Sequence, residues 1–107
     1  MINIGLIGFG YWGPNLARNF NVNADFNLAA ICDFSPSRLE LAGRYYPQAT
    51  LYNNIEEFFK DTNLAAIAIA TPVGARYEIA KKALLSGRHV LIEKPMTKTV
   101  HQSVELI

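Results

Sequence analysis

The chain has 107 residues, of which 50% are hydrophobic and 18% are charged, and its formal net charge is +1. These values are typical of one globular domain and leave no basic patch for nucleic acid or an anionic membrane. The longest apolar stretches are far shorter than the roughly 20 residues that a membrane span needs. A single cysteine excludes an intrachain disulfide, and the N-terminus has no secretory pattern, so we expect a cytoplasmic protein.

The first half of the chain predicts two strand–helix units. Apolar runs over residues 2–7 and 26–32 predict buried strands. Helices are predicted over residues 12–20 and 35–45, the second with Ser35 as N-cap and Pro36 at its first position. The Asn-rich stretch 19–27 between these units predicts a loop.

The second half repeats the same alternation. Strands are predicted near residues 50–52, 65–70 and 89–92, and helices over 55–59, 75–85 and from Thr99 onward. Gly87 is expected to end the helix over 75–85. Side chains expected to face the sheet from these helices and from the helix over 35–45 are Tyr45, Tyr46, Phe58, Phe59, Tyr77, Ala80, Ala83 and Leu84.

Strands that alternate with helices imply a parallel sheet with helices on both faces. The expected fold is therefore a doubly wound α/β domain of three layers, α/β/α. The last helical pattern still runs at Ile107 without a cap, so we expect residues 1–107 to be one dinucleotide-binding domain truncated at its C-terminus.

The segment from Gly8 to Gly13 has the pattern G-x-G-x-x-G between the first strand and the first helix. Gly8 permits a tight turn, Gly10 lets the backbone approach a diphosphate, and Gly13 lets helix and strand pack closely. The helix N-terminus then offers N–H groups to phosphate. We expect this segment, with Tyr11 and Trp12, to bind a dinucleotide; a glycine turn needed only for packing is the alternative.

Asp33 follows the second strand, 20 residues after Gly13. A carboxylate there accepts the ribose hydroxyls of an adenosine and repels a 2′-phosphate, which predicts NAD over NADP. The alternative is an aspartate that only caps the next turn. Arg38 could stack on adenine, reach a 2′-phosphate or be a solvated helix residue.

Two further strand ends carry candidate residues. Thr71 and Pro72 end the fourth strand, and Glu93, Lys94 and Pro95 end the fifth. Ligands bind at the carboxyl edge of such sheets, so these segments should share one crevice with the glycine turn. Lys94 has the reach and the titratable proton for acid/base work on a substrate hydroxyl, and a solvated lysine is its alternative reading.

Other residues that often carry chemistry are less informative. His89 and His101 are far apart in the predicted fold, and no metal-ligand spacing is completed, so no metal site is expected. Cys32 lies in an apolar strand and is expected to be a buried small hydrophobe.

The segments GFGYWG, IATP (residues 69–72) and IEKP (residues 92–95), together with Asp33, resemble the N-terminal half of the Gfo/Idh/MocA oxidoreductases. The resemblance covers nearly the whole chain and implies a Rossmann fold. It also implies that Lys94 assists hydride transfer at a sugar carbon, beside the nicotinamide. The GFGYWG form of the glycine motif, with its tryptophan, resembles the branch of the family that acts on sugars and nucleotide-sugars.

The family often has a histidine four residues after the TP proline, where this chain has Arg76. The resemblance also implies a C-terminal domain, absent from this chain, that holds further catalytic groups and the sheet through which subunits form homo-oligomers. Two rival functions remain: a nucleotide-binding module without chemistry, and a domain that binds S-adenosylmethionine. Lys94→Ala and ligand competition would separate them.

Overall fold

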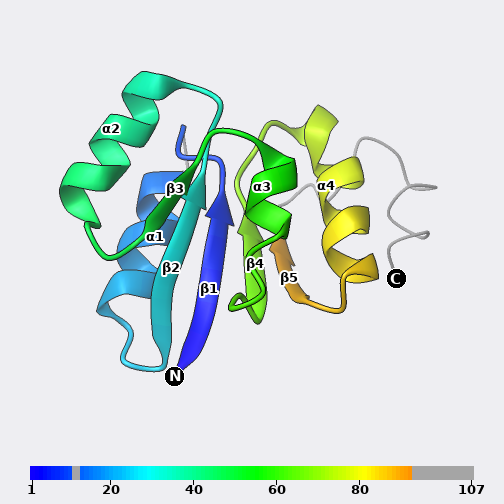
Figure 1. The fold of residues 1–107 in the computed structure, drawn as a ribbon, viewed down its shortest axis with the longest axis horizontal. Coiled ribbons are helices and arrows are strands. Elements are labelled where there is room, and N and C mark those ends of the chain that lie inside the picture. Colours follow the sequence, from blue (N-terminus) through cyan, green and yellow to red (C-terminus); the bar gives the residue numbers. More distant parts are fainter. Residues whose placement is uncertain (11–12, 93–107) are drawn as a thin grey trace.

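The computed structural model describes residues 1–10 and 13–92, in which strands alternate with helices as predicted (Figure 1). The strands are β1 (Ile2–Ile7), β2 (Phe26–Cys32), β3 (Thr50–Tyr52), β4 (Ala66–Ile69) and β5 (His89–Ile92). The helices are α1 (Gly13–Val22), α2 (Pro36–Tyr45), α3 (Ile55–Phe59) and α4 (Val73–Leu85). The helix predicted from Thr99 onward lies outside the described residues.

The strands form one parallel sheet in the order β3-β2-β1-β4-β5. From the central strand β1, the chain first moves to β2 and β3 and then crosses to β4 and β5. Figure 1 shows this reversal beside β1. It is the doubly wound Rossmann arrangement, in which the carboxyl ends of the strands on either side of the reversal border a crevice.

Each face of the sheet has its own apolar core, which confirms the predicted three layers. Helices α1 and α2 contribute Ala17 and Ala42 to one core, together with Tyr46, which directly follows α2, and strand residues such as Leu28. Helices α3 and α4 cover the other face with a second set that shares no residue with the first. Its buried members are Ile7, Ala30, Cys32, Phe58, Leu64, Ile67, Ile69, Ile79, Ala80 and Ala83.

The predicted Asn-rich loop is shorter in the structure. Helix α1 continues to Val22, so the turn before β2 spans only residues 23–25. Asparagine is a poor helix former, but the rings of Phe20 and Phe26 pack edge to face, 5.2 Å apart between centroids. This contact and the packing of Leu16 on the core hold the last turn of α1 against its weak intrinsic propensity.

Two side chains that were expected to face the sheet, Tyr45 and Leu84, point outward instead. Tyr45, the last residue of α2, is 67% exposed, whereas Tyr46 follows the helix with non-helical backbone angles and packs in the core, edge to face with Phe9. In α4 the inward positions are held by Ile79, Ala80 and Ala83, which leaves Leu84 exposed. Gly87, with φ of +83°, follows this helix as predicted.

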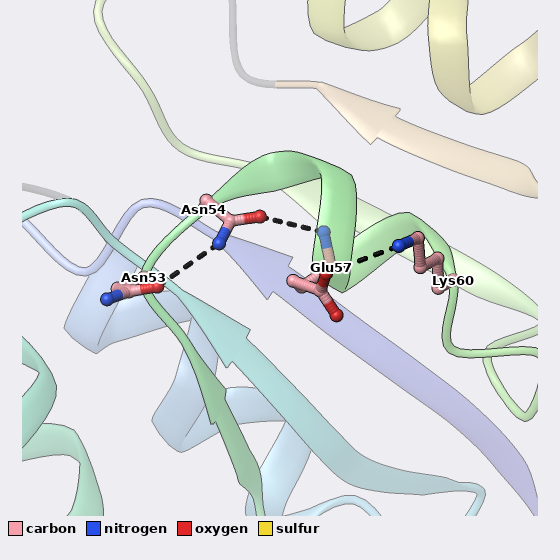
Figure 2. Close-up of polar contacts among 4 residues, drawn as sticks. All are labelled: Asn53, Asn54, Glu57 and Lys60. Carbon is pink, nitrogen blue, oxygen red and sulfur yellow. Dashed lines mark hydrogen bonds and ion pairs between the residues drawn. The ribbon is translucent and has the colours of Figure 1, made fainter.

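The short helix α3 depends on a side-chain cap, shown in Figure 2. The Oδ1 atom of Asn54 accepts a hydrogen bond of 2.8 Å from the backbone N–H of Glu57. Its Nδ2 atom donates to Oδ1 of Asn53 at 3.3 Å, and Lys60 pairs with Glu57 one turn later. The cap satisfies one of the N–H groups that the first helical turn leaves unpaired.

Two further features are absent from the described residues. No helix among them is long and apolar enough to cross a membrane. Nor does this part of the chain hold a group of three or more His, Cys, Asp or Glu side chains that could bind a metal ion.

Candidate functional site

The turns after β1, β2 and β4 surround a cavity of about 450 Å³, which is within the size range of small-molecule sites. The described lining residues that the sequence predicted as ligand-binding are Gly8, Gly10, Asp33, Arg38, Thr71 and Pro72. Lining residues that were not predicted as such are Ile7, Cys32, Phe34, Ala70, Ala75, Arg76 and Ile79. The predicted residues Tyr11, Trp12, Glu93, Lys94 and Pro95 lie outside the described residues.

The glycine turn brings the start of α1 against the end of β1. Gly8 has φ of +98°, and a Cβ there would lie 2.9 Å from the carbonyl oxygen of Ala70. A Cβ on Gly13 would lie 2.0 Å from the carbonyl oxygen of Gly8. Only glycine permits these approaches, and they hold the N-terminus of α1 at the carboxyl edge of the sheet, where its N–H groups could receive a phosphate.

Asp33 connects two of the turns around the cavity. Its side chain is buried, with 8% of the residue exposed. Its Oδ2 accepts a hydrogen bond of 2.7 Å from the N–H of Phe9, and its Oδ1 accepts one of 2.8 Å from the N–H of Ser35. Asp33 therefore has the turn-capping role that was the alternative interpretation. Because each carboxylate oxygen has a second lone pair, it can also accept a ligand hydroxyl from the cavity.

The side chain of Arg38 extends from the first turn of α2 toward the glycine turn. A Cβ on Gly10 would lie 3.0 Å from Nη1 and 3.2 Å from Cζ of Arg38. The guanidinium thus lies against Gly10 in the cavity wall, although the residue as a whole is exposed. This placement does not fit a purely solvated helix arginine, and it puts a permanent positive charge where a ligand phosphate would be attracted.

Arg76 is a site residue whose role sequence reasoning missed. It is half-buried, one turn into α4, and its Nε donates a 2.8 Å hydrogen bond to the carbonyl oxygen of Thr71. The arginine thereby fixes the turn between β4 and α4. Its position after a strand end at the ligand edge was a signal that could have identified it.

Cys32 forms part of the cavity floor but is chemically quiet. The thiol is 1% exposed. Burial, and to a smaller extent the negative charges of Asp33 and Glu56, raise the pKa of Cys32 from 9.0 to about 11. The thiol stays protonated at neutral pH, which confirms a buried small hydrophobe and leaves no basis for a nucleophile.

The raised pKa of Cys32 predicts a pH dependence of stability. Because the unfolded thiol ionises near 9.0 and the folded one near 11, this group's contribution is complete below pH 9 and is lost as the pH rises to 11. Urea unfolding at pH 8 and pH 10 measures the loss. Burial also raises the pKa values of Tyr46 and Tyr52, so their contributions to the stability of the domain also fall as the pH rises. The loss in the parent chain is therefore compared with the loss in Cys32→Ala, which keeps both tyrosines. An equal loss in Cys32→Ala would contradict the assignment.

Comparison with known proteins gives a family match over nearly the whole chain. A family model described as an oxidoreductase family with an NAD-binding Rossmann fold matches residues 2–107. The uncharacterized oxidoreductase YdgJ of Escherichia coli is 31% identical over 105 residues, which cover 98% of this chain and 30% of that protein. The scyllo-inositol 2-dehydrogenase (NADP(+)) IolW of Bacillus subtilis is 30% identical over 110 residues, covering 98% of this chain and 29% of IolW.

Among solved structures, the fold matches a dehydrogenase crystallised with its ligands. The WlbA dehydrogenase of Bordetella pertussis, in complex with NADH and UDP-GlcNAcA, superposes with a TM-score of 0.91 at 28% identity. The match covers 98% of this chain and 33% of that chain. The chain thus spans about a third of the length of each of these three proteins.

Proposed function

Because the chain belongs to the Gfo/Idh/MocA oxidoreductase family, with its NAD-binding Rossmann fold, we propose that it is the cofactor-binding part of an NAD-dependent dehydrogenase. The observation that carries the proposal is the single cavity that Gly8, Asp33 and Thr71 share. A dinucleotide requires an approach free of side chains, a helix N-terminus for its diphosphate and a carboxylate for its ribose. The glycine turn, the start of α1 and Asp33 are groups of these kinds.

In this proposal the residues have separate roles. Gly8, Gly10 and Gly13 admit the diphosphate to the N-terminus of α1, and Asp33 accepts the ribose hydroxyls. When bound, the nicotinamide supplies the hydride acceptor or donor. Lys94 moves the proton of the substrate hydroxyl. The remaining contacts to the cofactor are assigned to Tyr11, Trp12, Arg38, Thr71, Pro72, Glu93 and Pro95.

The proposed substrate is a sugar or nucleotide-sugar that is oxidised or reduced at a hydroxyl-bearing carbon. Two relatives support this class: IolW is named for an inositol, and WlbA was crystallised with a nucleotide-sugar. We propose that the whole enzyme forms a homo-oligomer and acts in the cytoplasm. In that enzyme, Lys94→Ala should abolish turnover and retain NADH binding, whereas Lys60→Ala, at an exposed position directly after α3, should change neither. Unchanged turnover in Lys94→Ala would favour a binding module without chemistry.

The choice of cofactor is the first point to test. The carboxylate of Asp33 favours NAD, whereas Arg38 in the same cavity wall offers a partner for a 2′-phosphate, and IolW is named as NADP(+)-dependent. We expect NADH to bind more tightly than NADPH, because Asp33 is buried in the site and Arg38 lies at its exposed border. Titration of the chain with each dinucleotide, followed through quenching of its only tryptophan, Trp12, measures both affinities.

Asp33→Asn should weaken NADH binding about tenfold, because a hydrogen bond to a charged acceptor is worth about 1.5–3 kcal/mol. Asp25→Asn is the matched control, since Asp25 is exposed in the turn before β2, at the opposite edge of the sheet. Urea unfolding checks that each variant is folded, because Asp33 also accepts two backbone hydrogen bonds. A folded chain that binds neither dinucleotide, or that binds S-adenosylmethionine in competition with them, would overturn the proposed function.

A further inference from the structure

Phe9 lies between two glycines of the turn that follows β1, and its ring is buried in the core instead of lining the cavity. Only 3% of the residue is exposed, and it belongs to the apolar core that α1 and α2 cover. Gly8 and Gly10, on either side of it, do line the cavity. The turn therefore presents glycine backbone to a ligand and is anchored in the core through Phe9.

Two backbone hydrogen bonds tie the start of this turn to the end of β2. The N–H of Gly8 donates to the carbonyl oxygen of Cys32 at 2.8 Å, and the N–H of Phe9 donates to Oδ2 of Asp33 at 2.7 Å. A segment rich in glycine has many accessible conformations, so the direction of its N–H groups depends on what holds it. Neither of these bonds holds the ring of Phe9, which needs a partner of its own.

That partner is Tyr46, which directly follows α2. The two rings meet edge to face, with 6.3 Å between their centroids. The backbone of Tyr46 is held on both sides: its N–H donates to the carbonyl oxygen of Ala42 at 2.9 Å, and its carbonyl oxygen accepts from the N–H of Ala49 at 3.0 Å. The residue is also buried. Tyr46 thus offers Phe9 a fixed surface to pack on.

We propose that Tyr46 is a positioning residue for cofactor binding, which acts through the ring of Phe9 to hold the glycine turn in the conformation that receives the diphosphate. The inference rests on the proposed function and adds a residue that does not line the cavity. Ordering a loop on binding costs affinity, so a turn held in place beforehand binds its ligand more tightly. Because Phe9 also donates to Asp33, the same contact aligns the turn with the carboxylate assigned to the ribose.

Calorimetry of NADH binding to Tyr46→Leu and Tyr46→Phe tests the role of the ring. Leucine keeps an apolar side chain without the ring, so NADH should bind about fivefold more weakly, as expected when one more residue must be ordered on binding. Phenylalanine keeps the ring and should retain the parent affinity within about twofold. Phe20→Leu is the matched control, because it removes another edge-to-face contact of the same core, with Phe26, in the last turn of α1. Equal NADH affinity of Tyr46→Leu and Phe20→Leu would overturn the inference.

A double-mutant cycle tests whether Tyr46 acts through Phe9. Phe9→Leu should itself weaken NADH binding about fivefold. Adding Tyr46→Leu to it should weaken binding no further, because the contact between the two rings is already lost. Losses that multiply to about 25-fold would show two independent effects and would overturn the inference.

Hydrogen exchange gives a readout that needs no cofactor. The amide N–H of Phe9, which is bonded to Asp33, should exchange about fivefold faster in Tyr46→Leu than in the parent chain, and at the parent rate in Phe20→Leu. Exchange rates of the β2 amides correct for changes in global stability. An unchanged rate for Phe9 in Tyr46→Leu would overturn only the further inference. If the folded parent chain binds no NADH, the proposed function fails, and the cofactor role of Tyr46 fails with it.

Discussion

Replacing Gly13 with alanine should destabilise the domain by about 3 kcal/mol, the upper part of the range for overpacking, and should abolish saturable NADH binding. The added Cβ would lie 2.0 Å from the carbonyl oxygen and 2.9 Å from the carbonyl carbon of Gly8. Both are backbone atoms of the turn after β1, so no side-chain rotation relieves the contact. Helix α1 must move away from β1, and its N–H groups leave the place where we expect the diphosphate. Urea unfolding and the tryptophan titration measure the two effects.

Gly43→Ala is the control for this substitution, since Gly43 is also helical. A Cβ there would meet only Cδ1 of Leu51, at 3.1 Å, which is the end of a flexible side chain at the edge of the sheet. Alanine also favours a helix over glycine by about 1 kcal/mol, so Gly43→Ala should leave stability unchanged or raise it. Equal stability of Gly13→Ala and the parent chain would show that α1 does not depend on this contact.

The strand bounds could be predicted from the sequence because buried parallel strands are short apolar runs between polar or glycine residues. Residues 2–7, 26–32, 50–52 and 89–92 are strands in the structure with the predicted ends. The start of the second helix could be predicted equally well, because Ser35 and Pro36 act through local contacts in its first turn. Oγ of Ser35 accepts a hydrogen bond from the N–H of Arg38. Local signals of this kind need no knowledge of the tertiary fold.

Contacts between distant segments were not predictable in the same way. A Cβ on Gly5 would lie 2.5 Å from Cζ of Phe58. The ring of Phe58, which belongs to α3, therefore packs directly on the backbone of β1. From the sequence, Gly5 is only a strand residue with a low propensity for β-structure. Its role depends on a partner more than fifty positions away, whose side-chain direction no local pattern specifies.

The candidate site shows the same division. The positions of Gly8, Asp33 and Thr71 at strand ends followed from the alternation of strands and helices. The contacts of these residues did not follow from that alternation. Asp33 both caps a turn and lines the cavity, although the sequence alone had left capping and ligand binding as alternatives. Phe34 was not among the predicted site residues, and only the structure shows its exposed ring beside the cavity.

Arg88 makes long-range hydrogen bonds to the segment that precedes β4. Its replacement is the second substitution for which we expect a large effect. Its Nη2 donates to the carbonyl oxygens of Phe59 and Asp61, at 3.2 and 2.6 Å. Its Nε donates to the carbonyl oxygen of Leu64 at 3.1 Å, and its Nη1 to Oγ of Ser86 at 3.0 Å. One side chain thus satisfies three backbone carbonyls between α3 and β4, a task that suits the fixed fork of a guanidinium.

Arg88→Ala should therefore cost about 3 kcal/mol of unfolding free energy, because it leaves partly buried carbonyls unpaired and removes charged hydrogen bonds. Arg88→Lys should recover little, since a single ammonium cannot span the three carbonyls. Arg44→Ala is the control: Arg44 pairs with Glu40 at the surface, where both side chains are about two-thirds exposed and such pairs contribute about 0–1 kcal/mol. Urea unfolding of the three variants gives the comparison. A loss in Arg88→Ala no larger than that in Arg44→Ala would mean that the segment before β4, and β4 with it, is held by its apolar contacts alone.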